Sequence, residues 1–143
     1  MSELFSKGAI TIYQSVWETM QKGEPLSGEG GMIADVMKEH PEFDPFWGMG
    51  EVAFQPQEIN GYVVNPLVHA GLHVTIEKQL MNDDPIEVGV AIKHLIAQGI
   101  TRHEAIHSVA GIWGNLYFRS VRRGDPMEEW VYLHELMALA DNT

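Results

Sequence analysis

The stretch from Thr101 to Gly124, TRHEAIHSVAGIWGNLYFRSVRRG, decides the fold class. Thr101 is a favoured helix N-cap residue, and Glu104 stands three positions later, where it would close a capping box. Gly124 lies where a helix commonly stops in a left-handed residue. These signals predict one long helix over residues 102–123, and therefore a chain built from helices.

The rest of the chain carries similar helix boundaries. Three further stretches each place a capping residue before a helix that begins with proline: NP at residues 65–66, DPIE at 84–87 and DPME at 125–128. Upstream, apolar residues recur at helical spacing over residues 4–23 and 32–40. We therefore predict an all-α, single-domain bundle of about six helices spanning residues 1–143, with the remaining helices at 66–82, 85–98 and 126–140.

The segment over residues 44–64, DPFWGMGEVAFQPQEINGYVV, lacks a helical period. It is predicted to be one long irregular loop, except that GYVVN at residues 61–65 has some character of a strand. Long loops in compact domains are often lids or binding loops. The alternative is a static cover, in which aromatic side chains pin the loop over the end of the bundle: Phe46, Trp47, Phe54 and Tyr62.

Composition argues against several classes of partner. The chain has no cysteine, so it lacks a disulfide framework and a thiolate zinc site, and it fits a reducing cytosol. Its formal net charge of −11 disfavours nucleic acid and anionic membranes, which attract clustered Lys and Arg. The basic cluster RSVRR at residues 119–123 is expected to complement a helix dipole. With no signal peptide or membrane span expected either, we predict a cytoplasmic protein that binds neither nucleic acid nor membrane.

Four of the seven histidines form two pairs with helical spacing. His69 and His73, like His103 and His107, are four residues apart, so each pair shares one face of its helix. Both faces are lined by apolar or small residues, and two such helices packed antiparallel would bring four imidazoles together. Imidazole suits Zn, Fe and Ni, and bundle cores commonly hold such sites. We predict that these four histidines bind a divalent transition metal (Zn, Fe or Ni).

Three further residues are candidates for the same site. His40 follows the apolar face of the helix that ends before Pro41, although it could instead be a helix-end cation beside a solvated loop. Glu77 lies one turn after His73, and Glu104 lies between His103 and His107; either could supply a carboxylate ligand or a base. His94 and His134 have no partner at helical spacing and are expected to be surface or interface residues.

The pentapeptide HEAIH at residues 103–107 resembles the motif of a zinc-peptidase helix. The extended motif needs Gly three residues after the second His and a further His beyond it, whereas this chain has Ala110 and Trp113. Glu104 also has a competing role in the capping box. A di-iron carboxylate site would need a second Glu-x-x-His, which the sequence lacks. Metallopeptidase activity is therefore not expected, and the sequence leaves open whether the protein is an enzyme.

A second interpretation comes from a different class of function. The histidines could form a hydrogen-bonded polar core in a non-catalytic interaction module. Small residues at Ala110, Gly111 and Gly114 would then allow close helix packing, within one chain or in a homodimer. With such buried neutral histidines, the free energy of unfolding of the protein would fall as pH drops through ~6.5, the pKa of histidine in the unfolded chain.

An ordered set of motifs resembles the bacterial family called domain of unknown function 1841. The motifs are HPEF at 40–43, NPLVHAGLHVTIEKQL at 65–80, DDP at 83–85, HEAIH at 103–107 and RRGDPMEEWVYLHEL at 122–136. The resemblance implies a small helical protein without an assigned activity, in which His40, His69, His73, His103 and His107 are matched positions. Members of the family tend to carry His in place of Asp44, and carboxylates in place of Gly111 and Asn115.

Overall fold

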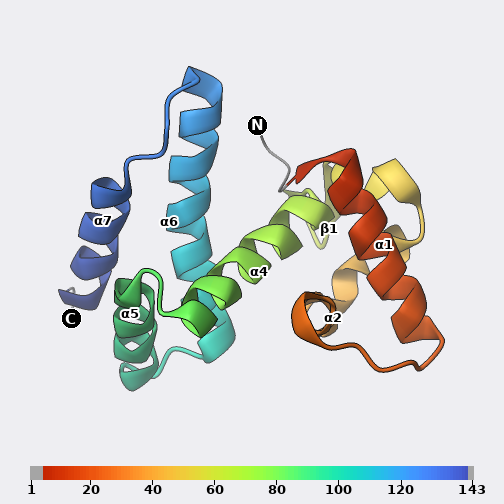
Figure 1. Cartoon of the computed structure of the whole chain (residues 1–143), viewed down its shortest axis with the longest axis horizontal. Helices are drawn as coiled ribbons and strands as arrows, with labels where there is room; N and C mark the ends of the chain where they lie inside the picture. Colours follow the sequence, from red (N-terminus) through yellow and green to blue (C-terminus); the bar gives the residue numbers. More distant parts are fainter. Residues whose placement is uncertain (1–4, 142–143) are drawn as a thin grey trace. The chain divides into compact units, whose positions relative to one another are not determined.

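The computed structural model describes residues 5–141 and is helical along most of that length (Figure 1). Within these residues it contains seven α-helices and a single two-stranded hairpin. The predicted all-α fold class is confirmed. The described chain forms two compact units, which divide between Val74 and Thr75 within helix α4 (Pro66–Asn82). The prediction of one domain over residues 1–143 stays a prediction.

The first unit begins with two helices that face each other. Ser6 caps α1 (Lys7–Gln21), since its hydroxyl accepts a hydrogen bond from the Ala9 N–H at 3.3 Å. Helix α2 (Gly28–Lys38) packs against α1 and buries its apolar stripe. Both helices contribute to a hydrophobic core that also takes in Trp47 and Leu67. This core positions the end of α2 and the start of α4, where the candidate site lies.

The prediction of one irregular loop over residues 44–64 is wrong in detail. The segment consists of the short helix α3 (Asp44–Trp47), the 3-10 turn η3 (Gly50–Phe54) and strands β1 (Gln57–Ile59) and β2 (Tyr62–Val64). Trp47 is fully buried against the aromatic rings of Tyr13 and Phe43. The short turns are therefore held by burial of their aromatic side chains, which a search for helical periods cannot detect.

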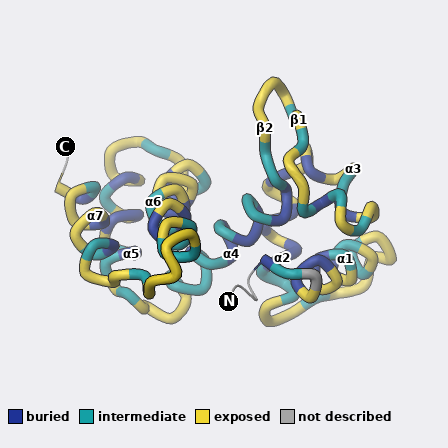
Figure 2. Tube along the Cα trace, turned by 90° about the horizontal axis from the view of Figure 1, so that it is seen from above, coloured by how far each residue is buried: buried dark blue, intermediate teal, exposed yellow. Residues whose placement is uncertain are grey.

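The hairpin is made by the dipeptide Asn60-Gly61. Both residues have positive φ values, 53° and 86°, as the two central positions of a type I′ turn require. The strands pair antiparallel with Gln57 opposite Val64 and Ile59 opposite Tyr62. Figure 2 shows the hairpin projecting from the first unit with an exposed tip, and Tyr62 is 73 % exposed. Tyr62 therefore does not pin the segment onto a core, in contrast to Trp47.

The second unit is built from α5 (Ile86–Ala97), α6 (Arg102–Arg123) and α7 (Glu129–Asp141), together with the end of α4. Helix α5 packs against both α6 and α7. Gly124 ends α6 in the left-handed conformation, with φ 70°, as predicted. Gly99 follows α5 in the same way, with φ 96°.

Two helix starts differ from the prediction. Helix α5 begins one residue late because Pro85 is extended and takes the N-cap position. Helix α7 begins at Glu129 instead of Pro126. The Asp125 N–H donates to the Ser120 carbonyl at 3.1 Å, so Asp125 closes the end of α6 and does not cap the next helix.

Tyr132 joins α7 to α4 within the second unit. Its hydroxyl donates a hydrogen bond to Gln79 Oε1 at 2.6 Å, and the residue is 3 % exposed. Replacing Tyr132 with Phe is expected to lower the free energy of unfolding by about 1 kcal/mol, because Gln79 loses a buried partner. Urea unfolding would measure this, with Tyr62→Phe as the exposed control. Equal stability of the two variants would contradict the assignment.

The burial of Tyr132 and of Tyr13 leads us to expect that the protein loses stability at alkaline pH. Burial raises the pKa of Tyr132 well above its usual value of 10.0, and burial followed by the charge of Glu29 raises the pKa of Tyr13. Above pH 10 the unfolded chain loses phenolic protons that the folded chain retains. The free energy of unfolding should therefore fall as pH rises through this range. Urea unfolding between pH 9 and 11 should show a smaller fall for Tyr132→Phe.

Candidate metal centre

Helix α4 supplies the first two histidines of the site. Asn65 Oδ1 accepts a hydrogen bond from the Val68 N–H at 3.2 Å and so fixes the start of this helix as predicted. His69 and His73 follow on one face, one turn apart, with ring centroids 4.9 Å apart and planes tilted by 27°. His73 is 2 % exposed, and His69 is half-buried. The two rings are stacked, and both residues lie in the part of α4 that belongs to the first unit.

The end of helix α2 supplies a third histidine. His40 follows α2 and precedes the 3-10 turn η2 (Pro41–Phe43). Its ring centroid lies 5.0 Å from that of His69 and 4.6 Å from that of His73, and both ring pairs meet edge to face. At 2 % exposure, His40 is not the solvated helix-end cation that was one of its two interpretations. The structure brings His40 together with the α4 pair.

A hydrogen bond defines the tautomer of His40. Its Nδ1 lies 2.7 Å from the carbonyl oxygen of Val36, one turn earlier in α2. A carbonyl only accepts, so Nδ1 carries the proton and donates it. The lone pair of the neutral ring is then on Nε2. Histidine ligands of metals commonly donate the other ring N–H to a carbonyl in this way, because the bond orients the ring.

Phe43 forms an apolar wall beside the histidines. Its ring stacks on His40 with a centroid separation of 5.4 Å and an interplanar angle of 3°. It also meets the edge of His69 at 5.4 Å, and Trp47 packs behind it at 6.2 Å. Phe43 is 2 % exposed, so the cluster has a low-dielectric side on which charge is poorly solvated.

The ring separations suit three ligands of one ion. A nitrogen ligand lies about 2.0–2.1 Å from Zn²⁺, which puts the ring centroid about 3.2 Å from the ion. Two rings bound at right angles would have centroids about 4.5 Å apart, and two bound at the tetrahedral angle about 5.2 Å apart. The observed separations of 4.6, 4.9 and 5.0 Å fall between these limits. Ligand nitrogens of His40 and His73, and of His69 and His73, lie within 4.8 Å of each other, but among the described residues these three histidines together do not form one group within that distance.

The other predicted ligands belong to the second unit. His103 is half-buried and His107 is exposed, and both lie in the first two turns of α6. Glu77 holds Arg102 in a two-pronged ion pair with both N–O distances at 2.8 Å, which gives this carboxylate a structural partner. It stays a prediction that a metal binds to His103, His107, Glu77 or Glu104.

Glu104 takes part in the start of α6, as the capping interpretation of HEAIH predicts. Its backbone N–H donates to Thr101 Oγ1 at 3.1 Å, and its side chain is exposed. Replacing Thr101 with Ala is expected to lower the free energy of unfolding by about 1 kcal/mol, since the first turn loses its cap. Thermal or urea unfolding would measure the loss, and Thr101→Ser is the matched control that retains the hydroxyl. A Thr101→Ala protein as stable as Thr101→Ser would refute the role of the cap.

Sequence reasoning missed the groups that orient and cover His40. Neither the Val36 carbonyl nor the ring of Phe43 was singled out, although Val36 stands four residues before His40, the spacing of a helical hydrogen bond. Asp44, four residues after His40, is exposed. Its pKa is raised by partial burial and then by the charge of Glu42.

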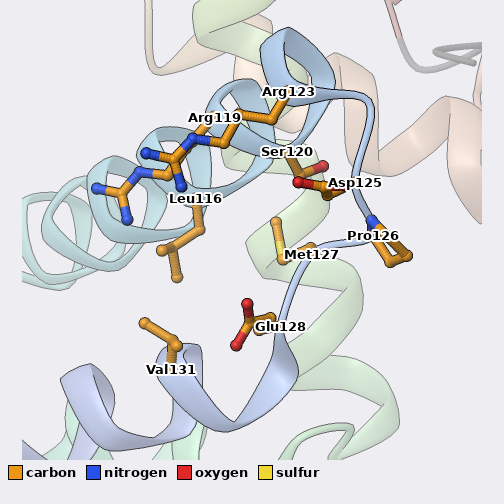
Figure 3. A pocket seen from close by; sticks show the side chains of 9 residues that line it. All are labelled: Leu116, Arg119, Ser120, Arg123, Asp125, Pro126, Met127, Glu128 and Val131. Carbon is orange, nitrogen blue, oxygen red and sulfur yellow. The ribbon is translucent and has the colours of Figure 1, made fainter.

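A separate hollow lies where α6 turns toward α7 (Figure 3). Leu116, Met127 and Val131 line it with apolar surface, and the guanidinium groups of Arg119 and Arg123 lie together along α6. Asp125 and Glu128 also line it, and its volume is about 80 Å³. This volume is well below the roughly 300 Å³ at which small-molecule pockets begin. The paired arginines at the end of α6 fit their predicted role of complementing the helix dipole.

Fold and site together define a helical protein with a buried histidine cluster. The family described as "Domain of unknown function (DUF1841)" matches residues 7–138, and the chain belongs to it. Comparison with curated proteins and with solved structures finds no match. Within the described residues, every helix is too short or too polar to span a membrane.

Proposed function

We propose that the first unit binds a divalent first-row transition metal, Zn²⁺, Fe²⁺ or Ni²⁺, through His40, His69 and His73. The observation that carries the proposal is the mutual approach of three imidazole rings, with centroids 4.6–5.0 Å apart. Neutral imidazole is a common ligand of these metals. Two ligands come from one helix and the third from a distant turn, so the ion would link the end of α2 to α4.

The orientation of His40 supports a metal-binding role. The Val36 carbonyl holds the Nδ1 proton, and Nε2 then offers its lone pair on the other side of the ring. A ligand oriented in this way loses little side-chain entropy when the metal binds. The hydrogen-bonded polar core is the alternative, in which the rings bond to one another and hold no ion.

His103 and His107 remain proposed as further ligands, and Glu77 and Glu104 as further candidates. The proposal rests on their sequence spacing, because each histidine pair shares one helix face. Replacing His103 and His107 together by Ala should lower the affinity if they contribute. Unchanged affinity would restrict the site to the three histidines of the first unit.

A cobalt titration tests the proposal. The protein is stripped with a chelator and titrated with Co²⁺, whose visible spectrum reports coordination by nitrogen. We expect saturation at one ion per chain, and loss of the signal in His69→Gln. His69 is the least buried of the three, so this variant is the one expected to keep its fold, which circular dichroism would check.

His134→Gln provides the matched control, because His134 is an exposed histidine on α7. It should bind Co²⁺ as the wild type does. No bound metal with Co²⁺, Zn²⁺, Fe²⁺ or Ni²⁺ in the folded wild-type protein would reject the proposal and favour the polar core.

The cellular setting and partners are proposed on composition. The lack of cysteine supports a cytoplasmic location, and the net charge of −11 supports a protein without a nucleic-acid partner. A homodimer stays a prediction. Gly111 is exposed, with open space where a side chain would begin, so that position leaves room for a neighbouring helix.

A further inference from the structure

The second unit contains a further hollow, to which several parts of the chain contribute. Residues of α4, α6 and α7 line it, together with the turn that leads into α5 and the turn that leads into α7. All of these residues belong to the second unit. The volume of the hollow is about 260 Å³, close to the roughly 300 Å³ at which small-molecule pockets begin. It therefore suits a small ligand.

Two hydrogen bonds hold the lining of this hollow in place. Tyr132, which is buried at 3 % exposure, donates from its hydroxyl to Gln79 Oε1 at 2.6 Å and so joins α7 to α4. The backbone N–H of Asp84 donates to the Gln79 carbonyl at 3.1 Å, which fixes the turn after α4. Gln79, Asp84 and Tyr132 all line the hollow. The folded chain therefore forms this hollow before any ligand binds.

Trp113 gives the hollow an aromatic wall. Its ring stacks on that of Tyr117, with centroids 4.8 Å apart and planes tilted by 12°. Because Tyr117 covers one face of the indole, the ring offers the hollow its other face or its edge. Pro85 and Met127 add apolar surface. The face of tryptophan attracts cations more strongly than that of the other aromatic residues.

The charge of the lining has one sign. Among the described residues, those that line the hollow include two carboxylates, Asp84 and Glu129, and no lysine or arginine. Both acidic residues are exposed, so they are ionised at neutral pH. Two negative charges beside an indole ring favour a cationic ligand. The apolar surface favours a cation with carbon substituents over a hydrated metal ion.

We propose that this hollow binds a small organic cation, an ammonium ion with alkyl substituents. Its charged nitrogen would lie beside the carboxylates of Asp84 and Glu129 and against the ring of Trp113. Its alkyl groups would contact Pro85 and Met127. The proposal uses none of the histidines of the first unit, so it stands or falls independently of the proposed metal centre.

The test uses choline as the probe and NMR of the isotope-labelled full chain as the readout. Choline replaces sodium at constant ionic strength, and the indole N–H signals of the four tryptophans are followed. We expect the signal of Trp113, assigned with Trp113→Leu, to shift and to saturate. The signal of Trp130, which is 68 % exposed and does not line the hollow, should stay in place. Dimethylbutanol, in which a carbon atom replaces the nitrogen of choline, is the uncharged control and should bind more weakly.

Removal of the two charges should weaken this binding. The double variant Asp84→Asn, Glu129→Gln keeps the shape of both side chains, and both are exposed, so the fold is expected to survive. Its affinity for choline should fall about 5-fold or more, because the cation loses two nearby opposite charges. Glu135→Gln is the matched control: it removes an exposed carboxylate of α7 that does not line the hollow, and it should bind choline as the wild type does.

Several results would overturn the proposal. If choline leaves the Trp113 signal unmoved in the wild-type protein, the hollow does not bind this class of cation. If dimethylbutanol binds as tightly as choline, the hollow selects apolar groups and not charge. Wild-type affinity for choline in the folded double variant would show that Asp84 and Glu129 do not recognise the ligand.

Discussion

Replacing His73 with Ala should lower the affinity for Zn²⁺ by more than about 100-fold, because even the loss of an outer-sphere partner of a ligand typically costs 10- to 100-fold. His73 is the best placed of the three histidines to show this effect. It is 2 % exposed, and its ring lies within 5 Å of the rings of both His40 and His69. Competition with a colorimetric chelator would measure the affinity.

Two controls separate loss of a ligand from loss of the fold. His134→Ala changes an exposed histidine and should keep wild-type affinity. The helical circular dichroism of metal-free His73→Ala should match that of the metal-free wild type. Wild-type affinity in a folded His73→Ala protein would show that this histidine does not bind the metal.

Replacing Phe43 with Ala should lower the free energy of unfolding by about 3–5 kcal/mol, because a fully buried aromatic ring leaves a cavity. Phe43 packs against the rings of Trp47, His40 and His69. The loss should therefore appear in stability and also in metal affinity, since both histidine rings lose a supporting wall. Urea unfolding of the metal-free protein would measure the first effect.

Tyr62→Ala is the matched control for that experiment. Tyr62 is an aromatic residue of the same unit but is 73 % exposed at the hairpin tip, so its loss should change stability by less than about 0.5 kcal/mol. A Phe43→Ala protein as stable as Tyr62→Ala would contradict the assignment of Phe43 to the core.

The long helices could be predicted because their signals are local. Thr101 and Gly124 mark the ends of α6, and Asn65 marks the start of α4, through bonds within one turn. The start of α7 was misplaced because Asp125 bonds to the preceding helix through its backbone N–H, a role that any residue except proline can take and that the sequence therefore does not mark. The hairpin turn at Asn60-Gly61 was readable from the dipeptide and was overlooked.

The site was only partly predictable for a different reason. The pairing of His69 and His73 follows from helical spacing, which is a local property. The approach of His40 depends on how α2 packs against α1 and on where the core places the start of α4. Such long-range packing has no signature in the residues around His40 other than the apolar stripe that precedes it.

The most direct test of the central claim is an anomalous difference map from a crystal of the protein reloaded with Zn²⁺, recorded at the zinc absorption edge. The account predicts a single strong peak about 2.0–2.1 Å from a ring nitrogen of each of His40, His69 and His73. No peak at these three rings, with the imidazoles hydrogen-bonded directly to one another, would contradict it.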